Sequence, residues 1–168
     1  MIFEIERKWV LNKLPEMCKG KEPLIIEQCY FSSSPTVRIR KSLDHRNPYR
    51  MTIKGSGTIK RVELEENISE EFYENLKKFF VKPQAVVQKK FWKFEIEGTK
   101  LHYEISTVDD LWHYVEVEFE TEEEALAFKA PDWFGKDVSE LISMKGYSDM
   151  KVKADKAFDY PAFFLDSE

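Results

Sequence analysis

Charged and apolar residues alternate along segment after segment of this chain, and this period of two is the pattern that most limits its fold. Side chains two apart on a β-strand share a face, so each such segment has one charged face and one apolar face. Eight segments have this strand-like pattern: Ile2–Val10, Leu24–Phe31, Thr36–Ser42, Tyr49–Lys54, Thr58–Ile68, Ala85–Ile96, Lys100–Thr107 and His113–Glu120. Turns such as Gly55-Ser56-Gly57 join them in sequence order, which predicts a mainly antiparallel β-meander or closed barrel.

Helices are expected in fewer places. Ser69 predicts a helix start because serine caps helices well, and acidic residues follow it in the first turn. A second helix is expected to begin near Thr121, and short tail helices around Asp137–Ile142 and Ser148–Ala157. An aromatic end is expected to dock on the body of the protein; it comprises Phe158, Tyr160, Phe163, Phe164 and Leu165.

Length and composition narrow the class of protein. The 168 residues suit one domain, spanning 1–168, and the net charge of −5 disfavours general nucleic-acid binding. No apolar stretch is long enough to span a membrane, and the charged N-terminus does not resemble a signal peptide, so we expect a soluble, cytoplasmic protein that does not bind membranes. Cys18 and Cys29 are expected to be reduced and packed, because their spacing fits neither a disulfide framework nor a zinc site.

The charged strand faces leave two arrangements open. If the strands close into a barrel, these faces lie either all outward, towards water, or all inward, as the lining of a tunnel. Helices and an aromatic tail need apolar surfaces to pack on, which favours charged faces inward and apolar faces outward beneath the helices. The acids come as Glu-x-Glu pairs and the bases as Arg-x-Arg and single lysines, a division that suits a divalent cation on one wall and a polyanion on another. The residues alone do not decide between the two arrangements.

Several short motifs occur in a family-specific order. These are Glu4-Ile5-Glu6-Arg7-Lys8, Arg38-Ile39-Arg40, Thr52-Ile53-Lys54, Glu63-Leu64-Glu65, Glu116-Val117-Glu118 and Lys145-Gly146-Tyr147 before an expected final helix. From Glu4 to about Tyr147 the chain resembles the CYTH, or triphosphate tunnel metalloenzyme, superfamily. The resemblance implies a closed eight-stranded antiparallel β-barrel with flanking helices, an α+β fold, whose tunnel binds a linear triphosphate with Mg²⁺ or Mn²⁺.

The resemblance also implies roles for individual residues. The implied metal-binding carboxylates are Glu4, Glu6, Glu63, Glu65, Glu104, Glu116 and Glu118. The implied triphosphate-binding bases are Lys8, Arg38, Arg40, Lys54, Arg61, Lys89 and Lys145, with Tyr30 near the substrate in some relatives. Lys89, Glu63 and Glu65 are the implied catalytic residues.

Two positions depart from the family pattern. Phe91 stands where many relatives have a second arginine or lysine, with Lys90 and Lys93 on the opposite face or further along. Gly146 replaces an arginine that often follows the late lysine. Both changes bear on which triphosphate is bound more than on triphosphate binding itself.

The predicted function is metal-dependent hydrolysis of a triphosphate, with inorganic triphosphate favoured because the short chain has no evident added domain to grip a base. A class IV type adenylyl cyclase, making cyclic AMP and pyrophosphate from ATP, is an alternative. So is a thiamine triphosphatase, with Trp92 or Trp112 as a stacking surface, although burial in the core is the commoner fate of a strand tryptophan. A polyphosphate-binding or nucleotide-binding module without turnover also stays open, as does the choice between monomer and homodimer.

Overall fold

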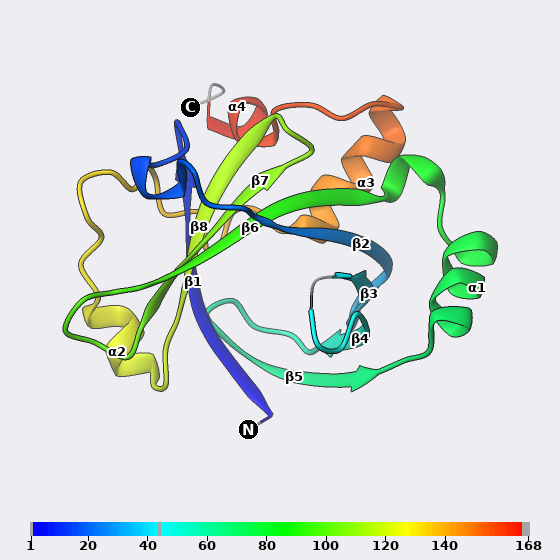
Figure 1. Cartoon of the computed structure of the whole chain (residues 1–168), viewed down its shortest axis with the longest axis horizontal. Coiled ribbons are helices and arrows are strands. Elements are labelled where there is room, and N and C mark those ends of the chain that lie inside the picture. Colours follow the sequence, from blue (N-terminus) through cyan, green and yellow to red (C-terminus); the bar gives the residue numbers. More distant parts are fainter. Residues whose placement is uncertain (1, 44, 166–168) are drawn as a thin grey trace.

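A computed structural model describes residues 2–43 and 45–165 of the chain, and within these ranges eight strands close into an antiparallel barrel (Figure 1). The strands are β1 (Phe3–Leu11), β2 (Leu24–Ser33), β3 (Thr36–Lys41), β4 (Tyr49–Lys54), β5 (Lys60–Asn67), β6 (Val87–Glu95), β7 (His102–Val108) and β8 (Trp112–Glu118). Their order around the barrel is β1-β5-β4-β3-β2-β6-β7-β8, and β8 returns to β1. The predicted eight-stranded antiparallel barrel is confirmed.

Strand β1 changes partner along one edge, which opens the barrel wall. Its first residues pair with β5, in the register Phe3↔Val62. From Lys8 onward, that edge instead pairs with residues 135–138, where Val138 N donates to Lys8 O at 2.9 Å. Gly135 lies so close to β1 that an added Cβ would meet Val10 O at 2.5 Å, so this pairing requires glycine. The predicted helix over Asp137–Ile142 is therefore wrong, because Asp137 bridges Trp9 in an extended segment that ends in a turn.

Two helix starts are confirmed, and the tail helices differ from the prediction. Ser69 caps α1 (Glu70–Phe80) and Thr121 caps α2 (Glu122–Ala127), each hydroxyl accepting a hydrogen bond from a first-turn N–H. Helix α3 (Met144–Ala154) begins before the expected Ser148, so the Lys145-Gly146-Tyr147 motif lies inside its first turn. The remaining helical segments are the 3-10 turns η1 (Glu16–Cys18) and η2 (Pro83–Ala85) and the final α4 (Tyr160–Leu165).

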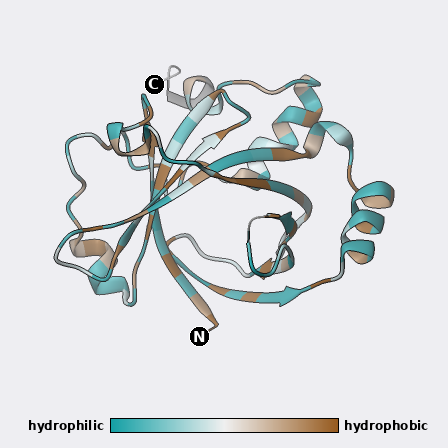
Figure 2. Cartoon of the chain, in the orientation of Figure 1, coloured by the Kyte–Doolittle hydropathy of each residue, from teal (hydrophilic) through white to brown (hydrophobic). Residues whose placement is uncertain are grey.

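Most of the apolar core lies outside the barrel wall. The outer faces of β1, β6, β7 and β8 pack under α2 and residues 128–134, around Trp9, Ile105 and Val115. A second cluster joins Ile39 of β3 to Tyr73 of α1. Figure 2 shows the resulting alternation of hydrophilic and hydrophobic bands, most clearly along β5. The period of two in the sequence thus marks an apolar exterior and a charged interior.

The expectation that helices cover the whole apolar exterior is wrong for one sector. The outward side chains of Phe3, Ile53, Val62 and Leu64 are all exposed, with Phe3 at 45% and Leu64 at 49%. These residues are neighbours on the paired strands β1, β5 and β4. The prediction assumed enough helix to cover the barrel all round, whereas α1 packs against Tyr49 at the start of β4 and α2 against β1, and both leave these four side chains exposed.

One end of the barrel is filled by an aromatic cluster. Tyr30, Trp112 and Tyr114 contribute from the strands, while Tyr147 of α3 and Tyr160 of α4 pack against them. The tail therefore docks as expected through Phe158 and Tyr160; the side chains of Phe163, Phe164 and Leu165 lie outside what is described. Trp92 and Trp112 are both buried, as expected for strand tryptophans. Among the described helices, none has the length and apolar character needed to cross a membrane.

Candidate functional site

The charged strand faces point into the barrel, and they bring the predicted bases together. One inner cavity is lined by all of the sequence-predicted bases: Lys8, Arg38, Arg40, Lys54, Arg61, Lys89 and Lys145. Tyr30, Tyr114 and Glu116 line the same cavity. The inward arrangement of the charged faces is thus the observed one.

Barrel register explains how bases and acids come to alternate around the interior. Arg38 of β3 lies opposite Thr52 of β4, which in turn lies opposite Glu65 of β5. The next inward row is Thr36, Lys54 and Glu63 in the same order. Neighbours on one face lie within side-chain reach, so both inward acids of β5 meet a base: Glu63 meets Lys54 directly opposite, and Glu65 meets Arg50 on the diagonal.

A buried amide holds Arg40 in place. Its guanidinium donates two hydrogen bonds to Gln28 Oε1, at 3.0 and 2.7 Å, and the Gln28 amide donates to the Tyr30 hydroxyl at 2.9 Å. Burial, then the nearby Arg38 and Arg50, lower the pKa of Arg40 to about 10. Arg40 thus remains protonated at neutral pH, with its direction fixed before any ligand binds.

Lys89 is buried and forms no ion pair within the described part of the chain, although the nearby Glu116 partly offsets its burial. Lys89 is 5% exposed. None of the described residues forms a hydrogen bond or ion pair with its Nζ atom. Its nearest aromatic contact is the Tyr114 ring, whose centroid lies 5.1 Å from Nζ. Burial, followed by repulsion from Arg40, lowers the pKa of Lys89 well below its ordinary value. Since an uncompensated buried charge is costly, this wall of the cavity favours an incoming anion.

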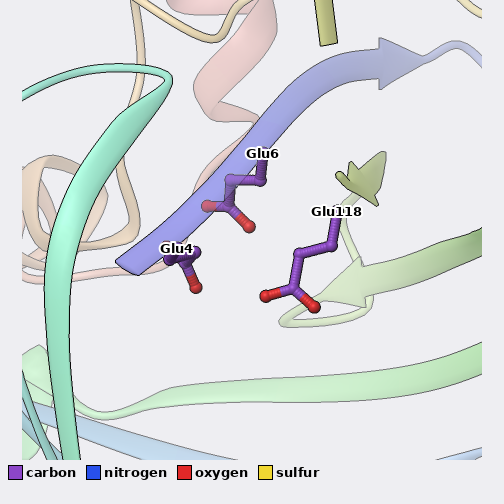
Figure 3. Close-up of side chains that lie close together, drawn as sticks. All are labelled: Glu4, Glu6 and Glu118. Carbon is purple, nitrogen blue, oxygen red and sulfur yellow. The ribbon is translucent and has the colours of Figure 1, made fainter. Parts of the chain in front are cut away.

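Three carboxylates lie close together in the barrel (Figure 3). Glu4 and Glu6 of β1 and Glu118 of β8 each offer an oxygen, and these oxygens lie within 4.8 Å of one another. Burial, then Glu63, raises the pKa of Glu4; burial, then Glu116, raises that of Glu6 well above its ordinary value. Of the three residues, Glu4 is buried, Glu6 half-buried and Glu118 exposed. Crowded carboxylates of this kind fit a hard divalent cation, which binds oxygen ligands and relieves their repulsion.

The other predicted acids lie along the walls rather than in this triad. Glu63 lies 3.7 Å from Lys54 Nζ, and Glu65 accepts hydrogen bonds from Thr52 and Arg50. Despite burial, Lys8 and Lys89 lower the pKa of Glu116 to about 2, so it is ionised at neutral pH.

Glu104 titrates differently from its wall neighbours. Burial, then Glu116 and Glu118, raises its pKa to about 7. Glu104 therefore carries a proton over much of the acidic range, when no cation is bound.

Sequence reasoning missed three residues of this interior. Arg50 shares the inward face of Thr52 and Lys54, and only 13% of its side chain is exposed. Gln28 orients Arg40, and Tyr114 lies beside both Lys8 and Lys89. The alternation of strand faces could have predicted all three residues, because each lies an even number of positions from a predicted inward residue.

The positions that depart from the family pattern are now placed. The β6–β7 register runs uninterrupted from Lys89 to Glu95, so Phe91 shares the face of Lys89. Lys93 lies further along that face, 3.8 Å from Glu104, whereas Lys90 lies on the other face and pairs with Asp110. Phe91 therefore occupies an inward position without a charge.

Two further cavities adjoin the triad. One, of about 240 Å³, lies at the opening beside β1 and shares Glu6, Lys8 and Arg61 with the inner cavity. The other, of about 560 Å³, lies beyond Glu4 and Glu118 and is lined partly by Phe119. The carboxylate triad therefore lies between these two openings.

Known proteins provide an independent comparison. Residues 3–153 match the model of the CYTH domain family, while no curated protein matches the chain. The inorganic triphosphatase NE1496 has a similar structure, with 26% identity and a TM-score of 0.59 over 88% of this chain and 95% of that one. The PH1012 protein of Pyrococcus horikoshii is 22% identical, with a TM-score of 0.54 over 83% and 99% of the two chains. A putative adenylate cyclase of Bacillus halodurans is 15% identical, with a TM-score of 0.53 over 85% and 100%.

The Pyrococcus horikoshii and Bacillus halodurans proteins are so distant in sequence that their similarity shows a shared fold alone. The family match is of a different kind, because it covers nearly the whole chain, from β1 through almost all of α3. The chain belongs to the CYTH domain family.

Proposed function

We propose that this protein is a metal-dependent triphosphatase that hydrolyses inorganic triphosphate inside the barrel. The observation that carries the proposal is the convergence of seven bases on one inner cavity beside the three clustered carboxylates of Glu4, Glu6 and Glu118. A linear triphosphate presents closely spaced negative oxygens, and binding it needs many fixed positive charges together with a cation.

Glu4, Glu6 and Glu118 would hold the divalent cation, Mg²⁺ or Mn²⁺. Once bound, such a cation neutralises phosphate oxygens and lowers the pKa of a water molecule. The three ligands suit a divalent cation because all of them are carboxylates. Burial, followed by repulsion from Glu4, raises the pKa of Glu118.

The remaining interior residues bind and orient the phosphates. Arg38 and Arg40 offer guanidinium forks, and Lys89 gains in the bound anion the partner that it lacks. Glu63 orients Lys54, and Glu65 orients Arg50, so these acids act in catalysis by fixing charges that face the reacting phosphate. Water attacks a terminal phosphorus, the bond to the leaving diphosphate oxygen breaks, and phosphate and diphosphate are released.

Similarity to an inorganic triphosphatase over most of both chains supports this choice of substrate. The free, buried Cys18 and Cys29 support action in a reducing compartment such as the cytoplasm.

A class IV type adenylyl cyclase is the second candidate, and the side opening favours it. That opening adjoins the inner cavity through Glu6, Lys8 and Arg61, and its volume of about 240 Å³ leaves space for an organic group attached to the triphosphate. The fold shared with a putative adenylate cyclase is compatible with this reading.

The test is product identification from inorganic triphosphate, ATP, GTP and thiamine triphosphate, each with Mg²⁺ and with Mn²⁺. Rapid release of phosphate from inorganic triphosphate, with slow nucleotide turnover, is the expected result. Cyclic AMP and pyrophosphate from ATP would favour the cyclase instead. Binding without any product would contradict both enzymatic readings and favour a binding module.

A further inference from the structure

A buried carboxylate outside the barrel interior links three segments of the chain. Asp109 lies in the β7–β8 turn, and its Oδ1 accepts a hydrogen bond from Gln88 N at 2.9 Å. Its Oδ2 accepts from the Tyr147 hydroxyl at 2.6 Å and from Lys151 Nζ at 2.8 Å. Both side chains of the ion pair are buried, at 9% exposure for Asp109 and 8% for Lys151. All the donors needed to satisfy this carboxylate are therefore in place.

The same contacts fix helix α3 against the barrel. Lys151 Nζ also donates to Val86 O at 2.6 Å, and the Ser148 hydroxyl donates to Ala85 O at 2.6 Å. Tyr147 and Lys151 are four residues apart, so one face of α3 carries both donors to Asp109. The β7–β8 turn, the start of β6 and α3 thus meet at one carboxylate.

The other end of α3 reaches the candidate site. Ser143, Met144 and Lys145 line the inner cavity together with the arginines of β3. Lys145 pairs with Asp149 one turn along the helix, so its ammonium has a position in the absence of phosphate. Lys151 lies six positions after Lys145, about 9 Å along a rigid helix, so the anchor at Lys151 sets where Lys145 lies.

We propose that Asp109 is a positioning residue: through Lys151 and Tyr147 it holds α3 so that Lys145 faces the bound triphosphate. The inference rests on the proposed function, because it assigns Lys145 a phosphate as its ligand. A buried ion pair is a poor source of net stability, since desolvation offsets its attraction, but it fixes orientation well. Orientation of Lys145 is the property that this anchor controls.

The turn itself offers a matched pair of variants. Asp109 and Asp110 both have positive φ, 49° and 56°, a conformation that asparagine also adopts readily. Asp109→Asn keeps the turn and the Oδ1 acceptor but removes the charge that holds Lys151. Asp110→Asn makes the same change at a side chain that is 74% exposed and that, among the described residues, pairs with Lys90.

The first test is the kinetics of inorganic triphosphate hydrolysis with Mg²⁺. Asp109→Asn is expected to raise KM about tenfold with kcat within about twofold of wild type, as for loss of a hydrogen bond to a charged group. In a Lys145→Ala background the same change is expected to have little further effect on KM. Equal losses with and without Lys145, or no loss in either, would overturn the proposal.

The second test does not depend on turnover. Hydrogen exchange of the ligand-free protein should show faster exchange in the first turn of α3 in Asp109→Asn, with the strands unchanged and Asp110→Asn equal to wild type. Faster exchange over the whole barrel, or none in α3, would overturn the anchoring role. If wild type neither binds nor cleaves triphosphate, the proposed function fails, while this measurement still decides whether Asp109 fixes α3.

Discussion

At Lys89, the requirements of ligand binding and of protein stability conflict most strongly. Its ammonium is buried beside two arginines and lies over an aromatic ring, and burial followed by Arg40 lowers its pKa well below the ordinary value. Glu116 attracts this charge but offsets its burial only in part, so the charge destabilises the empty protein until an anion arrives. Residues of this kind are a physical sign of a binding site.

Lys89→Met is therefore expected to improve stability and damage binding. Removing the buried charge while keeping the side-chain volume should raise the Tm of the ligand-free protein by at least about 2 °C. Affinity for inorganic triphosphate, measured by calorimetry, should fall by at least about tenfold. Lys90→Met, at the exposed neighbour on the opposite face, should change neither quantity. A lower Tm with unchanged affinity would contradict the role given to Lys89.

The sequence predicted which residues share the inward face of a strand, but it did not predict which residues they contact across the barrel. Lys8, Arg38 and Lys89 line one cavity because alternate residues on a strand share a face. The approach of Glu118 to Glu4 depends instead on β1 pairing with both β5 and β8, which no local pattern reveals. The amide that orients Arg40 depends in the same way on the β2–β3 register. Long-range closure, rather than residue choice, was the missing information.

At the scale of single elements, α1 is held to the barrel by a polar cluster under its apolar face. The fully buried Tyr73 donates to Glu27 Oε1 at 2.7 Å, and Lys77 forms an ion pair with the same oxygen at 2.9 Å. These contacts, after the opposing effect of burial, lower the pKa of Glu27. One carboxylate of β2 thus binds two side chains of α1, in addition to the apolar packing of Tyr73 and Leu76 on the barrel.

Tyr73→Phe tests this attachment. Loss of the hydroxyl should cost about 1–2 kcal/mol, because it leaves Glu27 short of one donor in a buried setting. The corresponding fall in Tm, measured by thermal unfolding, is about 2–8 °C. Turnover of inorganic triphosphate should be unchanged, since Tyr73 lies on the outer face of the barrel. Lys78→Ala, at the exposed neighbour of Lys77, should leave Tm within about 1 °C; an equal effect of both variants would refute the attachment.

The helix wrongly predicted over Asp137–Ile142 failed for a local reason. Asp137 Oδ1 accepts hydrogen bonds from both the amide and the hydroxyl of Ser139, which stabilises a turn in competition with a helix. The same Asp137 pairs with Arg7 across to β1. Helices α1 and α2 were predictable because Ser69 and Thr121 cap them within the sequence itself. Helix caps are local signals in the sequence. The strand-like pairing of residues 135–138 with β1 is a long-range contact and gives no local signal.

For the molecule as a whole, concentrated carboxylates make stability depend on pH and on divalent cations. The pKa of Glu104 is raised from 4.5 to about 7 by burial, then by Glu116 and Glu118. A carboxylate whose pKa is raised on folding stabilises the fold below its unfolded pKa, and that contribution is lost as pH rises through the folded pKa. In the metal-free protein, Glu104 therefore destabilises progressively between pH 4.5 and 7.

Glu104→Gln is expected to remove this loss. Between pH 5 and 8 the Tm of metal-free wild type should fall relative to that of Glu104→Gln, while Glu66→Gln, on the outer face of β5, should follow wild type. Added Mn²⁺ should raise the Tm of wild type more at pH 8 than at pH 5, because the cation then displaces fewer protons from the carboxylates. Parallel curves for wild type and Glu104→Gln would contradict the raised pKa.

In the proposed function, the barrel interior cleaves a triphosphate with a cation held by Glu4, Glu6 and Glu118. The most direct measurement is phosphate release from inorganic triphosphate, titrated with Mg²⁺ or Mn²⁺, for wild type, Glu6→Gln and the exposed control Glu66→Gln. Wild type and Glu66→Gln should be equally active and should stop turning over with a chelator. Glu6→Gln should need at least about tenfold more cation for half-maximal rate, if it turns over at all. Cation-independent cleavage, or equal cation dependence in all three proteins, would contradict the account.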